Sequence, residues 1–345
     1  MTKSKNLKIG IFDSGLGGLT VFKSLSLAFR SQSTFLYLGD LAHLPYGDKS
    51  ANSIIKYSEQ IVNFFINQNV DIIIIACNSA SSVALQYLQA KVTTPIIGTI
   101  IPSVEEVLHT TQPNKLVGII GTDTTVNSQA YNQAFLNHPL IAQHKIQISS
   151  VACPLFVPIV EEGWENTDIA HQIATKYLSN FNSADLNTII LACTHYPMLL
   201  DTLKSVFNQL GYNHLNFIES GNAIVNYLQQ NQSLIIESKH SSKLLNSSDQ
   251  FYITDNPYQF NNLANNIWKR KKKSIYLSNI ISFAYLLLFF YSSYELYVSA
   301  NKIVVIFVLL ICIFSDVGGY VIGKLVGGKK LTKISPNKTV SGSFG

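Results

Sequence analysis

Cysteine is scarce in this chain, and its spacing excludes two common kinds of cysteine site. The 345 residues contain four cysteines, Cys77, Cys153, Cys193 and Cys312, and no two of them form a C-x-x-C pair. A zinc ribbon or a thioredoxin-type redox site is therefore not expected. The N-terminus also lacks the apolar segment of a signal peptide, so we expect residues 1–268 to be cytosolic with reduced thiols.

The first part of the chain has no basic stripe and no lysine at the end of an expected strand. Five positive charges stand together at 269–273, which accounts for the formal net charge of +5. The basic character therefore belongs to the second part, and we expect no nucleic-acid partner. Without a strand-end lysine, nothing in the spacing requires pyridoxal phosphate bound as a Schiff base.

Strands and helices alternate along the first part, which predicts an α/β architecture with parallel sheets. A second series of the same pattern begins near residue 115. The expected strands are 7–12, 34–38, 72–75, 95–98, 115–120, 146–151, 188–191, 217–219 and 251–254. The expected helices are 19–28, 53–68, 80–90, one from about 128, 169–178, one that begins near Pro197, 223–229 and a short end piece at 260–268.

Two of these apolar strands end in the same dipeptide, Ala-Cys. Residues 72–75 lead to Cys77, and residues 188–191 lead to Cys193, 116 positions later. Open α/β sheets bind their ligands at the carboxyl ends of the strands. We therefore expect two equivalent strands that each offer one thiol to a shared cleft.

Three kinds of site could use two facing thiols. The cytosolic setting disfavours a disulfide, and a metal site would need more cysteine or histidine nearby than His195 alone. The third kind is a pair of bases that flank one carbon, which the symmetric placement of the thiols fits directly. One thiol then removes a proton, and the other returns a proton to the opposite face.

Such a reaction needs fixed donors, because the carbanion that forms next to a carboxylate is very unstable. Backbone N–H groups at Asp13-Ser14, Asn78-Ser79 and Thr194-His195 stand at predicted helix starts and could hold carboxylates there. Asp13 and His195 could also serve as acid or base partners of the two thiols.

Six segments, in order along residues 7–265, resemble the aspartate/glutamate racemase family. They are 10–20 (GIFDSGLGGLT), 45–47 (PYG), 76–78 (ACN), 121–122 (GT), 160–163 (VEEG) and 192–197 (ACTHYP). The resemblance implies two similar parallel-sheet α/β domains with the active site between them. The first would comprise 1–98 plus 210–265, because the chain after about residue 210 would complete the first sheet, and the second would comprise 99–209.

The resemblance also implies a reaction: cofactor-independent interconversion of L- and D-glutamate, whose D form supplies peptidoglycan synthesis. It implies Cys77 and Cys193 as the two catalytic acid/bases and no metal. The implied substrate contacts are Asp13, Ser14, Tyr46, Gly47, Asn78, Ser79, Thr194 and His195, with Asp40, Thr122 and Glu162 as further candidates. An aspartate-type racemase and a catalytically inactive binding module stay as alternatives. A homodimer is compatible with the sequence, which does not fix the oligomeric state.

Two departures from the family pattern lie near the expected cleft. Ser79 stands where the family usually has threonine, and the hydroxyl is kept. The segment Leu41-Ala42-His43 follows Asp40 where the family commonly has Thr-Ala-Arg. This change removes a charge beside the cleft loop, so the resemblance does not predict the local contacts there.

The tail after residue 273 differs in kind from the rest. Residues 274–294 carry no charge, and at 1.5 Å per residue they span about 30 Å, the thickness of a bilayer core. A second span is expected at 303–323. The basic linker 269–273 and Lys329-Lys330 both favour the cytoplasmic side. We therefore expect a two-helix transmembrane hairpin at 274–345 that anchors the cytoplasmic part to the inner face of the membrane, with the lipid bilayer as partner.

The last part of the tail, 316–339, resembles the phosphatidate cytidylyltransferase family of integral membrane enzymes. The acidic metal-binding signature of that family does not appear before Gly345, and 339–342 (TVSG) departs from its usual Thr-Trp-Glu-Gly. We expect no cytidylyltransferase activity from the tail by itself. The alternatives are a lipid-nucleotide transferase fragment that carries a racemase-like passenger, and a truncated or frame-joined gene.

Overall fold

The computed structural model describes residues 7–231, 248–255 and 298. Contacts divide the chain into two units, Met1–Lys269 and Arg270–Gly345. The expected end piece 260–268, the basic linker 269–273 and the expected spans 274–294 and 303–323 all lie outside the described residues. Within the described ranges, no helix is both long enough and apolar enough to cross a membrane.

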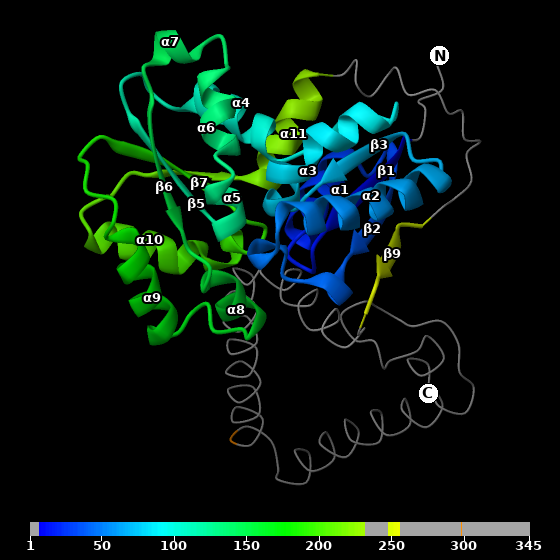
Figure 1. Ribbon diagram of the computed structural model, residues 1–345. Helices are drawn as coiled ribbons and strands as arrows, with labels where there is room; N and C mark the ends of the chain where they lie inside the picture. Colours follow the sequence, from blue (N-terminus) through cyan, green and yellow to red (C-terminus); the bar gives the residue numbers. More distant parts are fainter. Residues whose placement is uncertain (1–6, 232–247, 256–297, 299–345) are drawn as a thin grey trace. The chain divides into compact units, whose positions relative to one another are not determined.

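The first sheet contains five parallel strands and carries the first thiol (Figure 1). The order is β4-β3-β1-β2-β9, and β1 lies between β3 and β2 in a continuous register. The strands are β1 (Leu7–Asp13), β2 (Ser33–Gly39), β3 (Ile72–Ile75), β4 (Ile96–Ile97) and β9 (Gln250–Ile253).

The second sheet contains four parallel strands in the order β6-β5-β7-β8. These are β5 (Leu116–Gly121), β6 (Gln147–Ala152), β7 (Leu186–Ala192) and β8 (Asn216–Glu219). The order repeats β2-β1-β3-β4 of the first sheet, so β3 and β7 occupy the same place in the two sheets. The prediction of two equivalent strands before Cys77 and Cys193 is therefore confirmed. We call each sheet with its covering helices the first and the second domain.

One predicted strand belongs to a different sheet than we expected. We expected the chain after about residue 210 to complete the first sheet. β9 does so by pairing with β2, but β8 pairs with β7 in the second sheet. The sequence pattern of β8 would be the same in either sheet, because contacts with residues far away in the sequence decide which strands pair. The residue at which the chain divides between the domains stays a prediction.

Helices cover both faces of each sheet, which explains the uninterrupted apolar character of the strands. All four residues of β3 and all six of β5 are buried. The helices are α1 (Leu19–Phe29), α2 (Ala51–Asn67), α3 (Asn78–Lys91), α4 (Ile100–Thr110), α5 (Asp123–Asn127), α6 (Ala130–Leu136), α7 (Ile141–His144), α8 (Phe156–Glu161), α9 (Asp168–Leu178), α10 (Leu200–Gln209) and α11 (Ser220–Gln230). Short 3-10 turns are η1 (Leu41–His43), η2 (Tyr46–Asp48) and η3 (Tyr196–Leu199).

The sequence analysis missed the short helices α5 and α7, and it also missed α4 and α8, which share one feature. Each contains a proline, Pro102 in α4 and Pro158 in α8, in its first turn. The first turn of a helix tolerates proline because its N–H groups have no partner within the helix. Since α8 carries a residue of the cleft, this omission affected the site as well.

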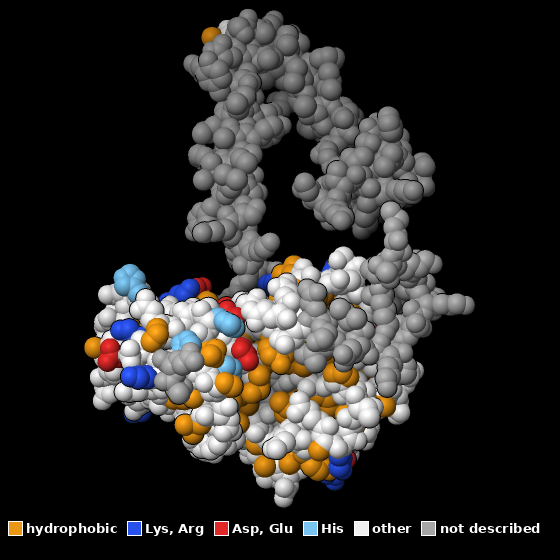
Figure 2. Space-filling view, turned by 90° about the horizontal axis from the view of Figure 1, so that it is seen from above, with side chains coloured by type: hydrophobic (Ala, Val, Ile, Leu, Met, Phe, Trp, Pro, Cys, Tyr) orange, Lys and Arg blue, Asp and Glu red, His pale blue; other side chains and the backbone are white. Residues whose placement is uncertain are grey.

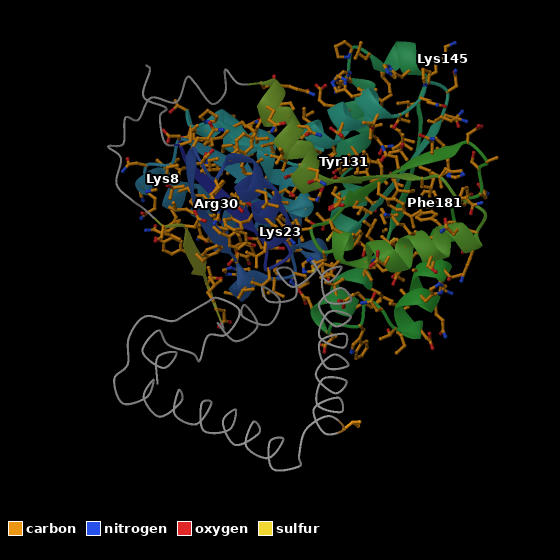
Figure 3. All side chains as sticks on the ribbon, turned by 180° about the vertical axis from the view of Figure 1, so that it is seen from behind. Lys8, Lys23, Arg30, Tyr131, Lys145 and Phe181 are labelled. Atoms are coloured by element: carbon orange, nitrogen blue, oxygen red, sulfur yellow. The ribbon has the colours of Figure 1, made fainter. Side chains whose placement is uncertain are left out.

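Aromatic side chains pack between the sheets and their helices; Figure 3 labels one of them, Phe181. Phe22 of α1 meets Phe35 and Tyr37 of β2 edge to face, at centroid distances of 5.6 and 6.3 Å. In the second domain Phe181 packs on Phe207 at 6.0 Å. The largest cluster of buried side chains includes residues of both sheets, so the two domains share part of their core.

Hydrophobic side chains also reach the surface, interspersed with polar ones on the face seen in Figure 2. Leu27 and Leu136 are the most exposed large ones of the two domains, at 75% and 67%. Scattered exposure of this kind is ordinary for a folded domain and indicates no interface by itself.

We expect Ile74→Ala to destabilise the full-length chain by about 2–5 kcal/mol, because Ile74 is fully buried in β3 and its loss leaves a cavity. Ile101→Ala is the matched control, since Ile101 is 40% exposed on α4, and should cost less than about 1 kcal/mol. Urea unfolding measures both. Equal losses would contradict this account of the core.

Candidate active site

A cleft of about 210 Å³ lies where the carboxyl ends of the strands of both sheets come together. Both expected thiols line it. The residues we predicted for the site that line the cleft are Ser14, Tyr46, Gly47, Cys77, Asn78, Ser79, Thr122, Cys193, Thr194 and His195. Of the remaining three, Asp13 and Asp40 contact lining residues from behind, whereas Glu162 is not part of the lining.

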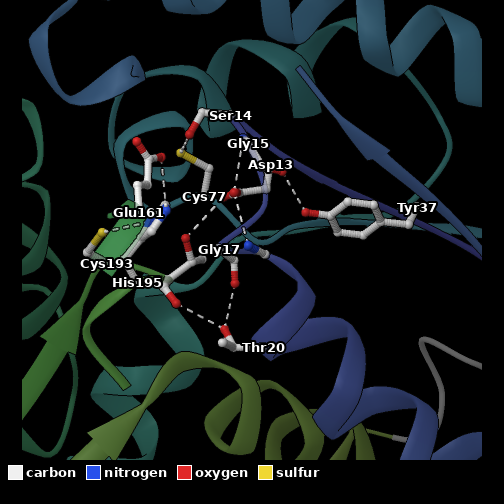
Figure 4. Close-up of polar contacts among 12 residues, drawn as sticks. Asp13, Ser14, Gly15, Gly17, Thr20, Tyr37, Cys77, Glu161, Cys193 and His195 are labelled. Atoms are coloured by element: carbon white, nitrogen blue, oxygen red, sulfur yellow. Dashed lines mark hydrogen bonds and ion pairs between the residues drawn. The ribbon is translucent and has the colours of Figure 1, made fainter. Parts of the chain in front are cut away.

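Cys77 follows β3 and caps the N-terminus of α3. Its Sγ lies 3.5 Å from the backbone nitrogen of Ala80 and 3.7 Å from Oγ of Ser14, and the residue is 5% exposed (Figure 4). Burial, followed by the nearby negative charge of Asp13, raises the pKa of the thiol to about 12. Cys77 is therefore protonated at neutral pH, and its thiolate is a strong base once formed.

Cys193 has a different environment, although it follows the equivalent strand β7. Its Sγ lies 3.9 Å from Nδ1 of His195, and the other ring nitrogen of His195, Nε2, lies 3.3 Å from Oε1 of Glu161 (Figure 4). The second contact is an ion pair without hydrogen-bond alignment, because Nε2 has no hydrogen-bond partner among the described residues. The three side chains form a row that leads from the thiol to the surface, where Glu161 is 38% exposed.

The row sets the charge of His195. Burial alone lowers the pKa of this imidazole, but its contacts with Cys193 and Glu161 outweigh burial and raise the pKa to about 10. His195 is therefore a cation at neutral pH. The Cys193 thiol and a cationic imidazole are therefore in direct contact in the cleft.

Glu161 is the cleft residue that the sequence analysis missed. The family resemblance implied Glu162 as a further candidate, but Glu161 ends α8 and lines the cleft, whereas Glu162 follows the helix and is not part of the lining. Adjacent residues on a helix point about 100° apart. Only the phase of α8 distinguishes them, and we had not predicted this helix.

Asp13 lies beneath the cleft at the end of β1 and is completely buried. Its Oδ2 accepts the N–H groups of Gly15 and Gly18 at 3.1 and 3.0 Å, and its Oδ1 accepts the hydroxyl of Thr194 at 3.3 Å. Burial raises the pKa of Asp13, and the charge of His195 and these hydrogen bonds oppose the rise. One carboxylate thus holds the loop after β1 in the first domain and the loop after β7 in the second.

The glycines of the first loop are needed for this close approach. A Cβ on Gly17 would collide with Oγ1 of Thr194 and with the ring of His195, and a Cβ on Gly18 would collide with Asp13. Thr20 adds a hydrogen bond of 3.1 Å to the carbonyl oxygen of Thr194. The glycines therefore allow the two domains to meet directly behind the thiols.

Tyr46 reaches the cleft from a loop that Asp40 holds in place. The Tyr46 hydroxyl donates to Oδ2 of Asp40 at 2.6 Å, and burial followed by this hydrogen bond raises the pKa of Tyr46. His43 Nδ1 lies 2.9 Å from both oxygens of Asp40, and its ring stacks on Tyr57 at 4.0 Å. Thr254, just after β9, donates to the same carboxylate at 2.8 Å. His43, the departure from the family pattern, is thus part of the support for Tyr46.

Hydroxyl groups close the cleft on one side. Oγ of Ser79 lies 2.8 Å from Oγ1 of Thr122, and the Thr124 hydroxyl donates to the carbonyl oxygen of Gly47 at 2.7 Å. Both contacts join the first domain to the second. Ser79, which replaces the usual threonine of the family, uses its hydroxyl in this contact.

The lining has donors for an anion but no cationic Lys or Arg among its described residues. Backbone N–H groups at the start of α3 and the hydroxyls of Ser14 and Ser79 are donors that the cleft offers to a carboxylate. The described residues also contain no group of three or more His, Cys, Asp and Glu that could hold a metal. Two thiols with separate support in one anion-compatible cleft define a two-base racemase or epimerase site on a two-domain α/β fold.

Comparison with known proteins agrees with this class. The family model for Asp/Glu/hydantoin racemases matches residues 18–228. The curated glutamate racemase of Sulfurihydrogenibium sp. is 40% identical over 278 residues, which cover 80% of this chain and 100% of that protein. The glutamate racemase of Campylobacter jejuni is 37% identical over 265 residues, 76% of this chain and 98% of that protein.

Solved structures are similar as well. The crystal structure of glutamate racemase from Francisella tularensis in complex with D-glutamate has a TM-score of 0.65 at 34% identity. The match covers 76% of this chain and 93% of that one. Glutamate racemase from Campylobacter jejuni has a TM-score of 0.64 at 35% identity, and covers 77% of this chain and 100% of that one.

The chain belongs to the Asp/Glu/hydantoin racemase family, as its sequence motifs predicted. The tail matches a second family model, that of the cytidylyltransferases, over residues 233–345. The resemblance noted for the tail is therefore confirmed as a similarity.

We expect Glu161→Gln to lower the pKa of His195 below the wild-type value of about 10, because the variant removes the negative charge next to Nε2. The pKa of His195 is higher in the folded chain than in the unfolded chain, where it is about 6.5, so protonation of His195 stabilises the fold. This stabilisation is complete below pH 6.5 and is lost as the pH rises towards 10. The variant should therefore lose less stability than wild type between pH 6.5 and 10.

Imidazole NMR titration measures the pKa, and urea unfolding at several pH values measures the stability. Glu162→Gln is the matched control and should leave both unchanged. An unaltered His195 titration in Glu161→Gln would contradict the assigned contact.

Proposed function

We propose that this chain interconverts L-glutamate and D-glutamate without a cofactor, and that the D-glutamate supplies peptidoglycan synthesis. The observation that carries the proposal is the pair of thiols, Cys77 and Cys193, at equivalent strand ends in one cleft. Relatives that match over nearly their whole length are glutamate racemases, which supports glutamate as the substrate.

We assign the binding of the substrate carboxylates to donors already fixed by the fold. Ser14 and Ser79 contribute hydroxyls beside the thiols, and Asn78-Ser79 and Thr194 contribute backbone N–H groups. Neutral donors suffice for a carboxylate when they are preorganised in a buried site. Tyr46 and Gly47 also line the cleft, where Asp40 holds the hydroxyl of Tyr46 and Gly47 lies next to Thr122.

The reaction is a transfer of one proton on each face of the α-carbon. The thiolate of one cysteine takes the α-proton, and the electron pair of the broken C–H bond stays on the α-carbon as a carbanion. The thiol of the other cysteine then protonates this carbon from the opposite face and becomes the thiolate. The reverse reaction exchanges the two roles.

The environments of the thiols suit this task. An α-proton is far less acidic than an ordinary thiol. A thiolate of high basicity therefore reduces the difference in pKa between the α-carbon, which donates the proton, and the sulfur, which accepts it. The buried Cys77, with its pKa raised to about 12, is such a base. We assign His195 as the acid/base partner of Cys193 and Asp13 as the charge that acts on Cys77.

We expect the purified chain to exchange the α-proton of L-glutamate for deuterium in deuterated water and to convert it into a racemic mixture with no added cofactor. Mass spectrometry and chiral chromatography follow both events. Glutamate that keeps its proton and its configuration would rule out the proposed function. Aspartate is the comparison substrate, and faster turnover of aspartate would favour the aspartate-type alternative.

We expect Cys77→Ser and Cys193→Ser each to lower the rate of racemisation by about 10²–10⁴-fold, because a hydroxyl is a much weaker acid than a thiol. Cys153→Ala is the matched control, since Cys153 is completely buried and does not line the cleft. The chiral assay measures all three variants. Normal turnover in either serine variant would refute the two-base assignment.

For the tail we propose attachment of the enzyme to the inner face of the cytoplasmic membrane. The support is the sequence: two uncharged or nearly uncharged stretches at 274–294 and 303–323, with basic clusters outside them. The similarity to a cytidylyltransferase family adds no activity to this proposal.

We expect the full-length chain to stay in the membrane pellet after carbonate extraction. A variant with Leu287→Arg and Leu288→Arg in the first span and Leu309→Arg and Leu310→Arg in the second should be released, because an arginine at the centre of a span costs about 2.5–3.5 kcal/mol. Immunoblots of pellet and supernatant measure both. Release of the unaltered chain would contradict the anchor.

A further inference from the structure

We propose that the side chain of Asn78 is a positioning residue that couples the alignment of Cys77 to the placement of the second domain. This inference rests on the proposed racemase function and deepens it. It concerns the carboxamide of Asn78, whose backbone N–H is a separate group that faces the cleft.

The carboxamide of Asn78 is buried, and its oxygen accepts two hydrogen bonds from the protein. Asn78 is 2% exposed at the first position of α3. Its Oδ1 accepts the hydroxyl of Tyr131 at 2.7 Å and the hydroxyl of Thr99 at 2.8 Å, and its Nδ2 donates to Oγ of Ser220 at 3.2 Å. Both lone pairs of the oxygen are used within the protein, so the fold holds the oxygen of this side chain in place.

The three hydroxyls come from segments that connect or belong to the other domain. Thr99 follows β4, the last strand of the first sheet before the chain enters the second domain. Ser220 is the first residue of α11, directly after β8 of the second sheet. Tyr131 lies on α6 of the second domain, near the junction of the two domains (Figure 3). One amide therefore joins two chain crossings and a helix of the second domain.

A second connection anchors the other side of the same turn. The hydroxyl of Ser81 donates to the carbonyl oxygen of Ile75 at 3.1 Å and accepts the backbone N–H of Thr99 at 3.1 Å. A Cβ on Gly98 would lie only 2.9 Å from Oγ of Ser81, so the crossing chain packs tightly on this turn. Thr99 is thus tied to Ile75, before Cys77, and to Asn78, after it.

The consequence concerns Cys77 more than Cys193. Cys77 stands between two residues that are both linked to the crossing at Thr99, so displacement of the second domain acts on its backbone from both sides. The thiol of Cys193 instead contacts His195, which belongs to its own loop. Removal of the Tyr131 hydroxyl should therefore disturb proton transfer at Cys77 in particular, since transfer depends steeply on alignment.

The test uses the full-length chain with Tyr131→Phe and the primary isotope effects of α-deuterated L- and D-glutamate. The equilibrium constant of a racemisation is one, so kcat/KM must change equally in the two directions. A misaligned thiol appears instead in the isotope effects, because the step at that thiol becomes the slower of the two. Tyr212→Phe is the matched control, since the Tyr212 hydroxyl donates to the carbonyl of Phe181 at 2.9 Å within the second domain.

We expect kcat/KM to fall by about 10-fold in Tyr131→Phe, which corresponds to one well-placed hydrogen bond. The isotope effect should rise for the enantiomer whose α-proton faces Cys77 and fall for the other enantiomer. Thr99→Val, which removes the second hydroxyl at similar volume, should shift both effects in the same sense, and Tyr212→Phe should shift neither.

The coupling would be overturned by isotope effects that stay unchanged in Tyr131→Phe and Thr99→Val, or that change in the same direction for the two enantiomers. If the wild-type chain is active in that case, the proposed function still holds. A wild-type chain that does not racemise glutamate would overturn the proposed function, and the coupling with it. The two failures are therefore distinguished by the wild-type measurement alone.

Discussion

The buried carboxylate of Asp13 is the interaction on which the arrangement of the site depends. A charge without access to water is costly unless hydrogen bonds surround it. Asp13 meets this requirement with two backbone N–H groups of its own loop and with the hydroxyl of Thr194 from the other domain. These bonds fix the glycine-rich loop, and the loop in turn leaves room for Thr194 and His195. The position of each thiol therefore depends on the same carboxylate, from opposite sides of the cleft.

The two thiols occupy equivalent positions in the two sheets but have different surroundings. Cys77 and Cys193 follow strands with the same place in the sheet order, which brings both to one cleft. Burial and the charge of Asp13 make the first thiol more basic, whereas the second stands beside a cationic imidazole. A reaction that runs in both directions needs two groups that can each be acid and base. In this structure the two groups have different neighbours: Asp13 lies near Cys77, and His195 contacts Cys193.

The sequence was sufficient for the features that follow from local rules. The apolar runs before Cys77 and Cys193 predicted their strands, and the rule that ligands bind at the carboxyl ends of strands predicted their cleft. Glu161 required the phase of α8, and the sheet to which β8 belongs required a pairing between distant segments. The hydroxyl partners of Asn78 lie up to 142 positions away, so no local pattern could have identified them.

The central claim is that the two thiols act on opposite faces of one carbon. A crystal structure of the full-length chain with D-glutamate bound tests this claim most directly, through the distances from the α-carbon to the two Sγ atoms. We expect both Sγ atoms within about 3–4 Å of that carbon, one on each face. A substrate with both thiols on the same face, or with one Sγ out of reach, would contradict the account.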